Sequence, residues 1–598
     1  MGISNKKKWK ANGSKHKRLD ITFFIMLGIM GIVALRFGIL MIISHSFYEK
    51  LASGSHEVYS QLFATRGSVY IQDSRTKEEF PLAINRDVFF VYANPQEIKE
   101  YTIKQEIDFE TFIQTIVTEV GDILVFDEDQ KEGMLKKLRK DRDPYEPIKK
   151  QVEEDIVDSI KEKELAGIHF LRQSVRYYPE HELASNVIGF LGKTEEGNDI
   201  GRYGIEGYWE KELAGVSGFF EGLKSAKGRW IPLGGSETKA SKDGVDLLLT
   251  IDRTLQFHAC DTLKKAMELY EAEDAALIIM DPRTGAIRSM CSFPDFDPNT
   301  YGHVETVESY NNATIFTPYE PGSIFKPITM AASLNEEVIT AQSVFYDSGQ
   351  RDAGCIYPIR NADGKVYKDQ SMSGLLENSV NTGMVWVAEQ VGKQTFKQYI
   401  EEFGFGIKQG ILMDTEASGS LETLNRRDND DMDCYTATAS FGQGISVTPL
   451  QVVTAFSAIA NGGTLFQPYI VEEIRHTDKA FEKTKQKELR RVISTRTAAT
   501  VSSMMVNVVD KGHAKLARVP GYYVAGKTGT AQIAEKGIYI DATNHSFVGF
   551  APVEDPQFVM IVKLGRPKSG KYSSATSAAV FGDIAQFILQ YYGVAPTR

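Results

Sequence analysis

The stretch FTPYEPGSIFKPITMAASLNEE, residues 316 to 337, organises the interpretation of the whole sequence. Pro321-Gly322 predicts a sharp turn, and the apolar residues after it recur at helical spacing. Pro327 is compatible with a helix only in its first turn, so the helix should begin close to Ser323. Lys326 then lies on the same face one turn later. A serine at a helix N-terminus beside a desolvated, neutral lysine is a chemically sensible activated nucleophile.

The S-x-x-K spacing alone carries little information. It also occurs at Ser4 with Lys7 and at Ser14 with Lys17, in a basic tail where no chemistry is expected. A helix-capping serine followed by a surface lysine is the plain alternative for the copy at residue 323. Other motifs must therefore decide between the two interpretations.

A second motif is Ser379-Val380-Asn381, which lies between two stretches with helical patterns and therefore on a connecting loop. Residues two apart in an extended loop point the same way, so Ser379 and Asn381 should face one cleft. A hydroxyl at 379 could relay a proton near Lys326, and the amide at 381 could hydrogen-bond a substrate peptide. Because serine and asparagine are also common loop formers, this motif is weak by itself.

A third motif is Lys527-Thr528-Gly529-Thr530, in GYYVAGKTGTAQI. The YYV run and the residues after Thr530 predict a strand. Gly529 would leave room for a substrate backbone to pair along that strand. Lys527 offers a fixed positive charge, and Thr530 a hydroxyl, for an anionic end group. The alternative is a β-turn with a chance Thr-Gly pair.

The three motifs in this order form a set shared by class A β-lactamases and penicillin-binding proteins. From about Arg66 to the C-terminus the chain resembles the class B, monofunctional penicillin-binding proteins. The middle motif is the Ser-Val-Asn variant of the family's element. Further shared segments are Arg66-Gly67, RYYP at 176–179, GIE at 204–206, DPRTG at 281–285, SFGQGISVTPLQ at 440–451 and FVGFAP at 547–552.

The resemblance implies a role for each motif residue. Ser323 would attack the carbonyl between the last two D-alanines of a stem peptide, Lys326 would take its proton, and Ser379 would pass a proton to the leaving D-alanine. Which group acts as the acylation base is disputed among related enzymes. The backbone N–H groups of Ser323 and Thr530 would form the oxyanion hole. The residues expected to bind substrate are Asn381, Lys527, Thr528, Gly529 and Thr530.

The predicted fold class is mixed α+β, in several domains. We expect a cytoplasmic basic tail at 1–20, a transmembrane helix at 21–43 and a stalk at 44–65. An elongated, β-rich pedestal (dimerisation-type) domain should follow at 66–240, with amphipathic helices between 96 and 165. A transpeptidase domain at 245–598 should contain a mainly antiparallel sheet flanked by helices, with a Gly-rich stretch, LGGSETKASKDG, marking the boundary before it.

The segment ITFFIMLGIMGIVALRFGILMII, residues 21–43, predicts a membrane anchor. As a helix it would span about 34 Å, against a hydrocarbon core of about 30 Å. The basic residues before it place the N-terminus in the cytoplasm and the catalytic domain outside the cell membrane. A cleaved signal peptide is the alternative, but its apolar region would be shorter. Arg36 is expected to snorkel to the outer headgroups, or else to contact a membrane partner.

Composition narrows the remaining possibilities. The 598 residues are 42% hydrophobic and 25% charged, with a net charge of −11, so nucleic acid is not an expected partner. The four cysteines, Cys260, Cys291, Cys355 and Cys434, show no metal-ligand spacing. We therefore expect no metal and no cofactor, and we expect the cysteines to be buried free thiols, with disulfides as the alternative in an exported domain.

The resemblance also implies partners. These are peptidoglycan stem peptides, β-lactams, a multi-spanning membrane glycosyltransferase and other cell-wall or division proteins. The alternatives are a D,D-carboxypeptidase or β-lactamase, in which water resolves the acyl-enzyme, and a non-turnover β-lactam sensor or assembly scaffold. A bifunctional polymerase is disfavoured because residues 44 to 240 match the pedestal pattern. The form SVNTGMVWVAEQVG favours a division-type over an elongation-type role.

Overall fold

The computed structural model describes most of the chain after residue 56. The described residues are 23, 26–28, 30–31, 57–62, 64–140, 143–223, 237–426, 432–478, 480–535 and 538–598. They belong to two compact units, one formed by residues 1–64 and 216–242, the other by 65–215 and 243–598. The predicted membrane span at 21–43 lies largely outside the described residues, and Arg36 entirely so. Within the part that is described, no helix is both long and apolar enough to cross a bilayer.

The first unit contains a small antiparallel sheet. Its strands are β1 (Glu57–Leu62), β8 (Gly218–Leu223) and β9 (Glu237–Lys239), in the order β1-β8-β9. The register pairs Glu57 with Leu223 and Leu62 with Gly218. β1 therefore lies inside the segment that the sequence predicted as a stalk.

A seven-stranded sheet runs through the second unit. Its strands are β2 (Val69–Gln72), β3 (Glu79–Ala93), β4 (Glu146–Val152), β5 (Ile168–Tyr177), β10 (Asp246–Asp252), β18 (Val471–Arg475) and β19 (Phe481–Lys483). β10 pairs with β2 in parallel and with β18 in antiparallel fashion. Residues on both sides of the Gly-rich stretch, 233–244, thus share one sheet.

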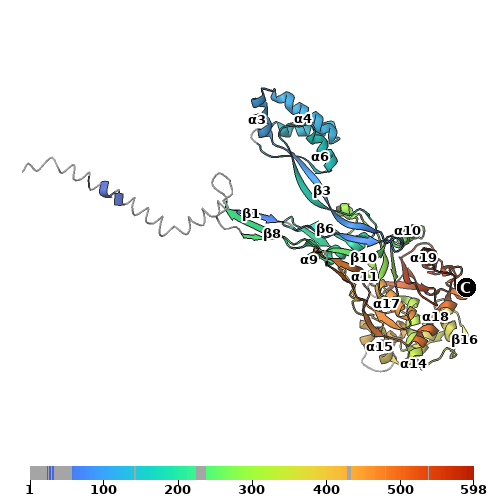
Figure 1. Ribbon diagram of the computed structural model, residues 1–598. Helices are drawn as coiled ribbons and strands as arrows, with labels where there is room; N and C mark the ends of the chain where they lie inside the picture. Colours follow the sequence, from blue (N-terminus) through green and yellow to red (C-terminus); the bar gives the residue numbers. More distant parts are fainter. Residues whose placement is uncertain are drawn as a thin grey trace, which may run out of the picture. The chain divides into compact units, whose positions relative to one another are not determined.

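A helical lobe lies at one end of the long strand β3 (Figure 1). It comprises α3 (Pro95–Gln105), α4 (Phe109–Ile123), α5 (Glu128–Leu138) and α6 (Glu154–Lys161). These helices carry the amphipathic pattern expected between 96 and 165, and they bury its apolar side in a core of their own, around Ile113, Ile116 and Val120. The sequence analysis missed β4, a short strand within this region in which three of the seven residues are charged.

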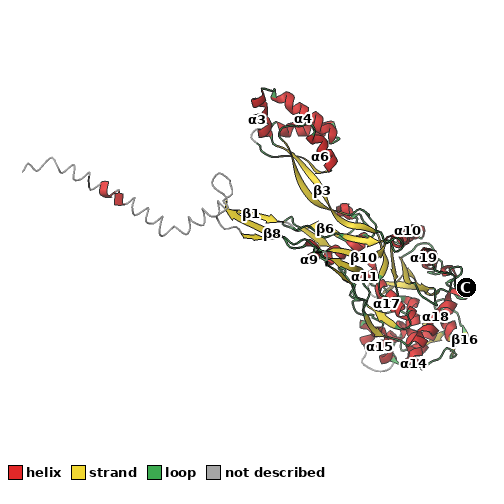
Figure 2. Cartoon of the chain, in the orientation of Figure 1, coloured by secondary structure: helices red, strands yellow, loops and turns green. Residues whose placement is uncertain are grey.

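The second unit also holds a five-stranded antiparallel sheet, one strand of which carries the Lys527–Thr530 motif. Its strand order is β12-β11-β23-β22-β21, from β11 (Asp274–Met280), β12 (Ile287–Phe293), β21 (Ala525–Glu535), β22 (Ile538–Ala551) and β23 (Phe558–Gly565). Helices α10 (Arg253–Leu269) and α19 (Ser577–Tyr591) pack against each other and against this sheet, as do α17 (Pro449–Ala460) and α18 (Thr495–Asp510) (Figure 2). The predicted antiparallel sheet flanked by helices is therefore present.

Local sequence explains where these elements begin. The residues of β11 after Asp274 are all apolar, with no alternation of polar and apolar side chains, and all of them are buried in the sheet. α17 begins with a capping box, in which Thr448 and Gln451 satisfy each other's backbone N–H groups, and with Pro449 in its first turn. α18 is capped by the side chain of Ser494.

Shorter elements complete the second unit. They are α7 (Ser185–Ile188), β6 (Phe190–Lys193), β7 (Asp199–Arg202), α8 (Gly204–Tyr208), α9 (Glu210–Ala214), α11 (Ala313–Phe316), α12 (Lys326–Asn335), β13 (Val344–Asp347), β14 (Gln350–Arg351), β15 (Ile359–Arg360), β16 (Lys368–Ser371), α13 (Met372–Glu377), α14 (Asn381–Val391), α15 (Lys393–Glu402), α16 (Cys434–Ala439), β17 (Thr464–Phe466) and β20 (Glu488–Arg491).

All four cysteines form disulfides, so the expectation of free thiols is wrong. Cys260 pairs with Cys291, linking α10 to β12, and Cys355 pairs with Cys434. Their Cα atoms lie 5.4 and 4.8 Å apart, within the range that a disulfide requires. Sequence spacing could not reveal these pairs because the partners are 31 and 79 residues apart.

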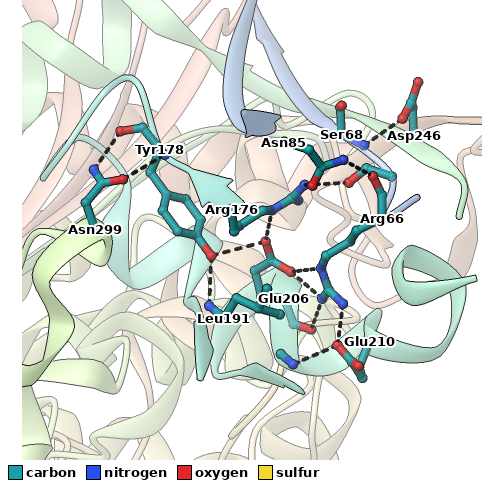
Figure 3. Close-up of polar contacts among 12 residues, drawn as sticks. Arg66, Ser68, Asn85, Arg176, Tyr178, Leu191, Glu206, Glu210, Asp246 and Asn299 are labelled. Carbon is teal, nitrogen blue, oxygen red and sulfur yellow. Dashed lines mark hydrogen bonds and ion pairs between the residues drawn. The ribbon is translucent and has the colours of Figure 1, made fainter. Parts of the chain in front are cut away.

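A buried carboxylate, Glu206, joins three of the segments shared with the family, namely Arg66-Gly67, RYYP at 176–179 and GIE at 204–206 (Figure 3). Glu206 accepts hydrogen bonds from Arg66 Nε at 2.8 Å and Arg176 Nε at 2.7 Å. Tyr178 donates to the same carboxylate at 3.3 Å and accepts from the N–H of Leu191. Burial opposes ionisation of Glu206, but the two guanidinium groups outweigh it and hold its pKa below the ordinary value.

Candidate active site

The turn at Pro321-Gly322 leads into the candidate nucleophile. A short 3-10 helix, η4 (Gly322–Phe325), continues directly into α12, which begins at Lys326 with Pro327 in its first turn. Gly322 has a φ of +57°, in the left-handed region that favours glycine. Ser323 therefore lies at the start of a helical segment, as the sequence predicted.

Ser379 lies opposite this turn, on the loop between α13 and α14. It has a φ of 55°, which is uncommon for a residue with a side chain, and its backbone is fixed by a hydrogen bond to Leu376. Its hydroxyl donates to Ser323 Oγ at 3.0 Å. Such local strain is typical of positions where a side chain must be aimed.

Lys326 is completely buried and binds this loop. Its Nζ donates to Ser379 Oγ at 3.0 Å, to the Ser379 carbonyl at 2.6 Å and to Asn381 Oδ1 at 2.8 Å. Burial, assisted by the charge of Lys527, lowers the pKa of Lys326 well below its ordinary value. The backbone N–H of Lys326 donates to the Ser323 carbonyl, but among the side-chain hydrogen bonds of the described residues none joins Lys326 Nζ to Ser323 Oγ. The Ser379 hydroxyl thus links the two side chains.

The Lys-Thr-Gly-Thr motif lies within β21, and not in the alternative β-turn. β21 is an edge strand, paired to β22 in the five-stranded sheet, and it begins at Ala525, just after the YYV run. A side chain at Gly529 would come within 2.9 Å of Ile324 Cγ2 and of the Pro321 carbonyl. Glycine here therefore lets the strand pack against the nucleophile's turn, a reason that the sequence analysis did not anticipate.

Lys527 completes the cluster of polar groups. Its Nζ donates to Ser379 Oγ at 3.2 Å and to the hydroxyl of Thr528 at 3.4 Å. Burial lowers the pKa of Lys527 to about 7, so the lysine is only partly charged near neutral pH until an anion joins it. The Thr530 hydroxyl bonds that of Ser573 at 2.9 Å.

The structure thus brings the hydroxyl of Ser379 into hydrogen-bond contact with Ser323, Lys326 and Lys527. A serine, a neutral amine and a hydroxyl relay can together activate an acyl-transfer nucleophile. Lys527 and the Thr530 hydroxyl lie at the strand edge, where an anionic end group could bind.

Sequence reasoning missed several supporting residues. Asn361 Oδ1 accepts the backbone N–H of Asn381, and the buried Asp347 accepts from Thr382 and Asn361, so both residues hold the 379–382 loop in place. Ser573 likewise fixes Thr530. Nothing in their spacing marks these residues, because each acts through a contact between distant segments.

Two families match the chain. Residues 275–586 match the penicillin binding protein transpeptidase domain, and residues 61–249 match the penicillin-binding protein dimerisation domain. The first match alone covers more than half of the chain and contains all three candidate motifs.

Individual relatives agree with these matches. Stage V sporulation protein D of Bacillus subtilis is 35% identical over 465 residues, covering 76% of this chain and 69% of that protein. Peptidoglycan D,D-transpeptidase FtsI of Escherichia coli is 30% identical over 453 residues, covering 75% and 73%. The crystal structure of penicillin binding protein 2X from Streptococcus thermophilus has the same fold, with a TM-score of 0.75 at 22% identity over 89% of this chain and 80% of that one. The chain belongs to the class B penicillin-binding proteins.

Proposed function

We propose that Ser323 is the nucleophile with which this peptidoglycan D,D-transpeptidase cross-links stem peptides ending in D-Ala-D-Ala. The observation that carries this assignment is the Ser379 hydroxyl, which bonds Ser323, Lys326 and Lys527 at 3.0, 3.0 and 3.2 Å. An amine whose pKa is lowered by burial can accept a proton from a serine through one intervening hydroxyl, once both hydrogen bonds of that hydroxyl reverse direction.

In the acylation step, Ser323 Oγ attacks the carbonyl of the penultimate D-alanine. Its proton passes through Ser379 to Lys326, and the same relay then protonates the departing D-alanine nitrogen. The backbone N–H groups of Ser323 and Thr530 stabilise the oxyanion. Penicillin, as a mimic of the donor, would acylate the same oxygen and remain attached.

In substrate binding, the donor peptide pairs with the free edge of β21, next to Gly529. Lys527, Thr528 and Thr530 hold its terminal carboxylate, whose charge would raise the pKa of Lys527 and keep that lysine protonated. Asn381 holds the peptide backbone. An amine from a neighbouring stem peptide then resolves the acyl-enzyme.

The direct test is to incubate the chain with a stem-peptide thioester and an amine acceptor, and to separate cross-linked dimers from hydrolysed monomers. Dimer formation that Ser323→Ala abolishes would support the proposal. Monomers alone would support the carboxypeptidase alternative. A covalent adduct without either product would identify a sensor. Ser323→Ala should also lose labelling by fluorescent penicillin; an adduct mapped to another residue would contradict the assignment.

We also propose the location and partners of this activity. The apolar segment 21–43 would anchor the chain, with the pedestal at 66–240 holding the transpeptidase domain at 245–598 away from the outer face of the membrane. A multi-spanning glycosyltransferase would supply nascent strands, and the division-type form of SVNTGMVWVAEQVG at 379–392 favours a septal role. Imaging a tagged copy tests this role, because accumulation along the side wall would contradict it.

A further inference from the structure

A carboxylate lies three residues before the nucleophile and has no role in acylation. Glu320 Oε1 accepts the backbone N–H of Gly444 at 3.1 Å, and Tyr539 OH donates to Oε2 at 3.0 Å. Among the ion pairs of the described residues, none includes Glu320. This half-buried carboxylate therefore has neutral hydrogen-bond donors around it and no cation.

The position of Glu320 is tightly fixed. Tyr319 exchanges two backbone hydrogen bonds with Val447, and the N–H of Gly322 donates to the carbonyl of Gly442 at 2.9 Å. The backbone on both sides of Glu320 is thus held against the segment 442–447. Its partner Tyr539 lies near the start of β22, opposite Ala534 of β21 in the register. Glu320 accordingly lies between the nucleophile's turn and this hairpin.

The motif residues supply no anion that could attract a cationic acceptor. The groups around the Ser379 hydroxyl are two lysines, Lys326 and Lys527. An acceptor amine with an ordinary pKa of about 10.4 arrives as an ammonium ion, which those lysines do not attract and which cannot attack until it loses a proton. A nearby carboxylate satisfies both needs, because it attracts the cation and can accept its proton.

We propose that Glu320 binds the ammonium group of the acceptor and removes its proton, so that the acyl-enzyme reacts with an amine in preference to water. This inference rests on the proposed transpeptidase function and assigns the second half of that reaction. Burial raises the pKa of Glu320 against the opposing hydrogen bonds from Tyr539 and Gly444, which makes it a better base than an exposed carboxylate. The Tyr539 hydroxyl, whose pKa burial and Glu320 raise, stays protonated and orients the carboxylate.

The step balances as follows. One proton of the ammonium ion passes to Glu320, and the freed nitrogen lone pair forms the new N–C bond at the Ser323 ester carbonyl. As the tetrahedral intermediate collapses, the C–Oγ bond breaks and its electron pair returns to Ser323 Oγ. The second nitrogen proton replaces the lost hydroxyl proton through Ser379. Glu320 then releases its proton to solvent.

The plain alternative is that Glu320 only ties the turn to the hairpin. Glu320→Gln separates the two roles, since glutamine keeps the shape and can still accept hydrogen bonds but has no charge. Tyr539→Phe does the reverse, since it removes one tie and keeps the carboxylate. Glu422→Gln is the matched control, because Glu422 is an exposed carboxylate on the nearby segment whose neighbour Thr423 bonds the Gly444 carbonyl.

The experiment measures how the acyl-enzyme of the full-length chain divides between acceptor and water. A stem-peptide thioester forms the acyl-enzyme, and the acceptor is either an alkylamine-bearing stem peptide or hydroxylamine, which is uncharged at neutral pH. Glu320→Gln should lower the ratio of aminolysis to hydrolysis for the alkylamine by about tenfold or more, and for hydroxylamine by less than about twofold. Glu422→Gln should match the parent, and Tyr539→Phe should lose less than Glu320→Gln.

The possible outcomes are distinct. An unchanged ratio in Glu320→Gln would overturn the inference, as would equal losses for the charged and uncharged acceptors, which would identify a purely structural tie. Because the ratio is measured only on acyl-enzyme that has formed, slower acylation does not affect it. If the parent chain forms no acyl-enzyme, the proposed function itself fails.

Discussion

Glu206, in the network beside the pedestal strands, and Lys326, in the active site, are both ionisable side chains with no exposed surface. Two arginines surround Glu206, whereas three oxygen acceptors and a second lysine surround Lys326. The pKa of Glu206 is lowered, which favours its charged form; the pKa of Lys326 is also lowered, which favours its neutral form. The same depth of burial therefore accompanies a structural ion in one region and, under the proposed mechanism, a base in the other.

This contrast teaches that the partners of a buried charge, and not its burial, determine its use. A buried carboxylate between two guanidinium groups is stabilised only while both remain, and it holds together Arg66, Arg176 and the segment that bears Glu206. A buried lysine without a carboxylate costs stability and is retained for another reason. Each prediction below alters one side of the comparison.

The largest effect is expected from Lys326→Ala. Loss of the base should lower the rate of acylation by fluorescent penicillin by about 10²- to 10⁴-fold. The substitution also removes three hydrogen bonds and opens a cavity, so the rate is measured on the molecules that remain folded. An acylation rate within about threefold of the parent would contradict the role of Lys326 as base.

The second effect concerns Glu206→Gln. Arg66 and Arg176 would lose their shared buried anion, so the free energy of unfolding should fall by about 3–5 kcal/mol in urea titrations. The acylation rate of the molecules that remain folded should stay at the parent's value. Glu210→Gln is the control, because Glu210 also binds Arg66 but is partly exposed, and its loss should cost less than about 1 kcal/mol. Equal losses for the two variants would remove the special status of Glu206.

The third effect is a pH dependence of folding stability that falls in different pH windows in the two regions. Lys527 has a pKa of about 7 when folded and 10.5 as its ordinary value. Between these values the unfolded chain binds the extra proton, so the contribution of Lys527 to folding stability becomes more favourable as pH rises from 7 to 10.5. Glu206 has the same sign in a more acidic window: its contribution is complete above its ordinary pKa and is lost as pH falls through the lower folded value.

Urea titrations of the parent and of Lys527→Met between pH 6 and 10 measure this difference. The variant should be more stable than the parent at pH 7. Its advantage should shrink toward pH 10, by at most about 1.4 kcal/mol per pH unit. An advantage that does not change with pH would mean that Lys527 titrates normally in the folded protein.

The sequence predicted the two regions unequally. The helix that begins near Ser323 and the strand that carries Lys527 both follow from local patterns, and the structure contains each of them. The active-site residues could be grouped because their motifs have a known order. The segments that contain Arg66, Arg176 and Glu206 could be identified only by their resemblance to the family. No local pattern indicates that the two arginines share the Glu206 carboxylate.

Other features escaped the sequence analysis for the same physical reason. The Cys260–Cys291 and Cys355–Cys434 pairs, the sheet shared by β2 and β10, and the contact of Tyr539 with Glu320 all join residues distant along the chain. Helix and strand periodicity reports only on neighbours, whereas these contacts depend on how whole elements pack.

The smallest effect is expected from Tyr178→Phe, which asks whether the two regions are coupled. The Tyr178 hydroxyl bonds Glu206 and the N–H of Leu191, while its backbone exchanges hydrogen bonds with the side chain of Asn299. Removing the hydroxyl should cost about 1 kcal/mol or slightly more, because the buried N–H of Leu191 loses its partner. The Asn299 contacts, which lead toward the transpeptidase sheet, would remain. The acylation rate should therefore stay within about twofold of the parent, since Tyr178 touches no residue of the Ser379 cluster. A tenfold fall in acylation by a stably folded Tyr178→Phe would show that the Glu206 network tunes the active site, and the separation between structural and reactive buried charges would no longer hold.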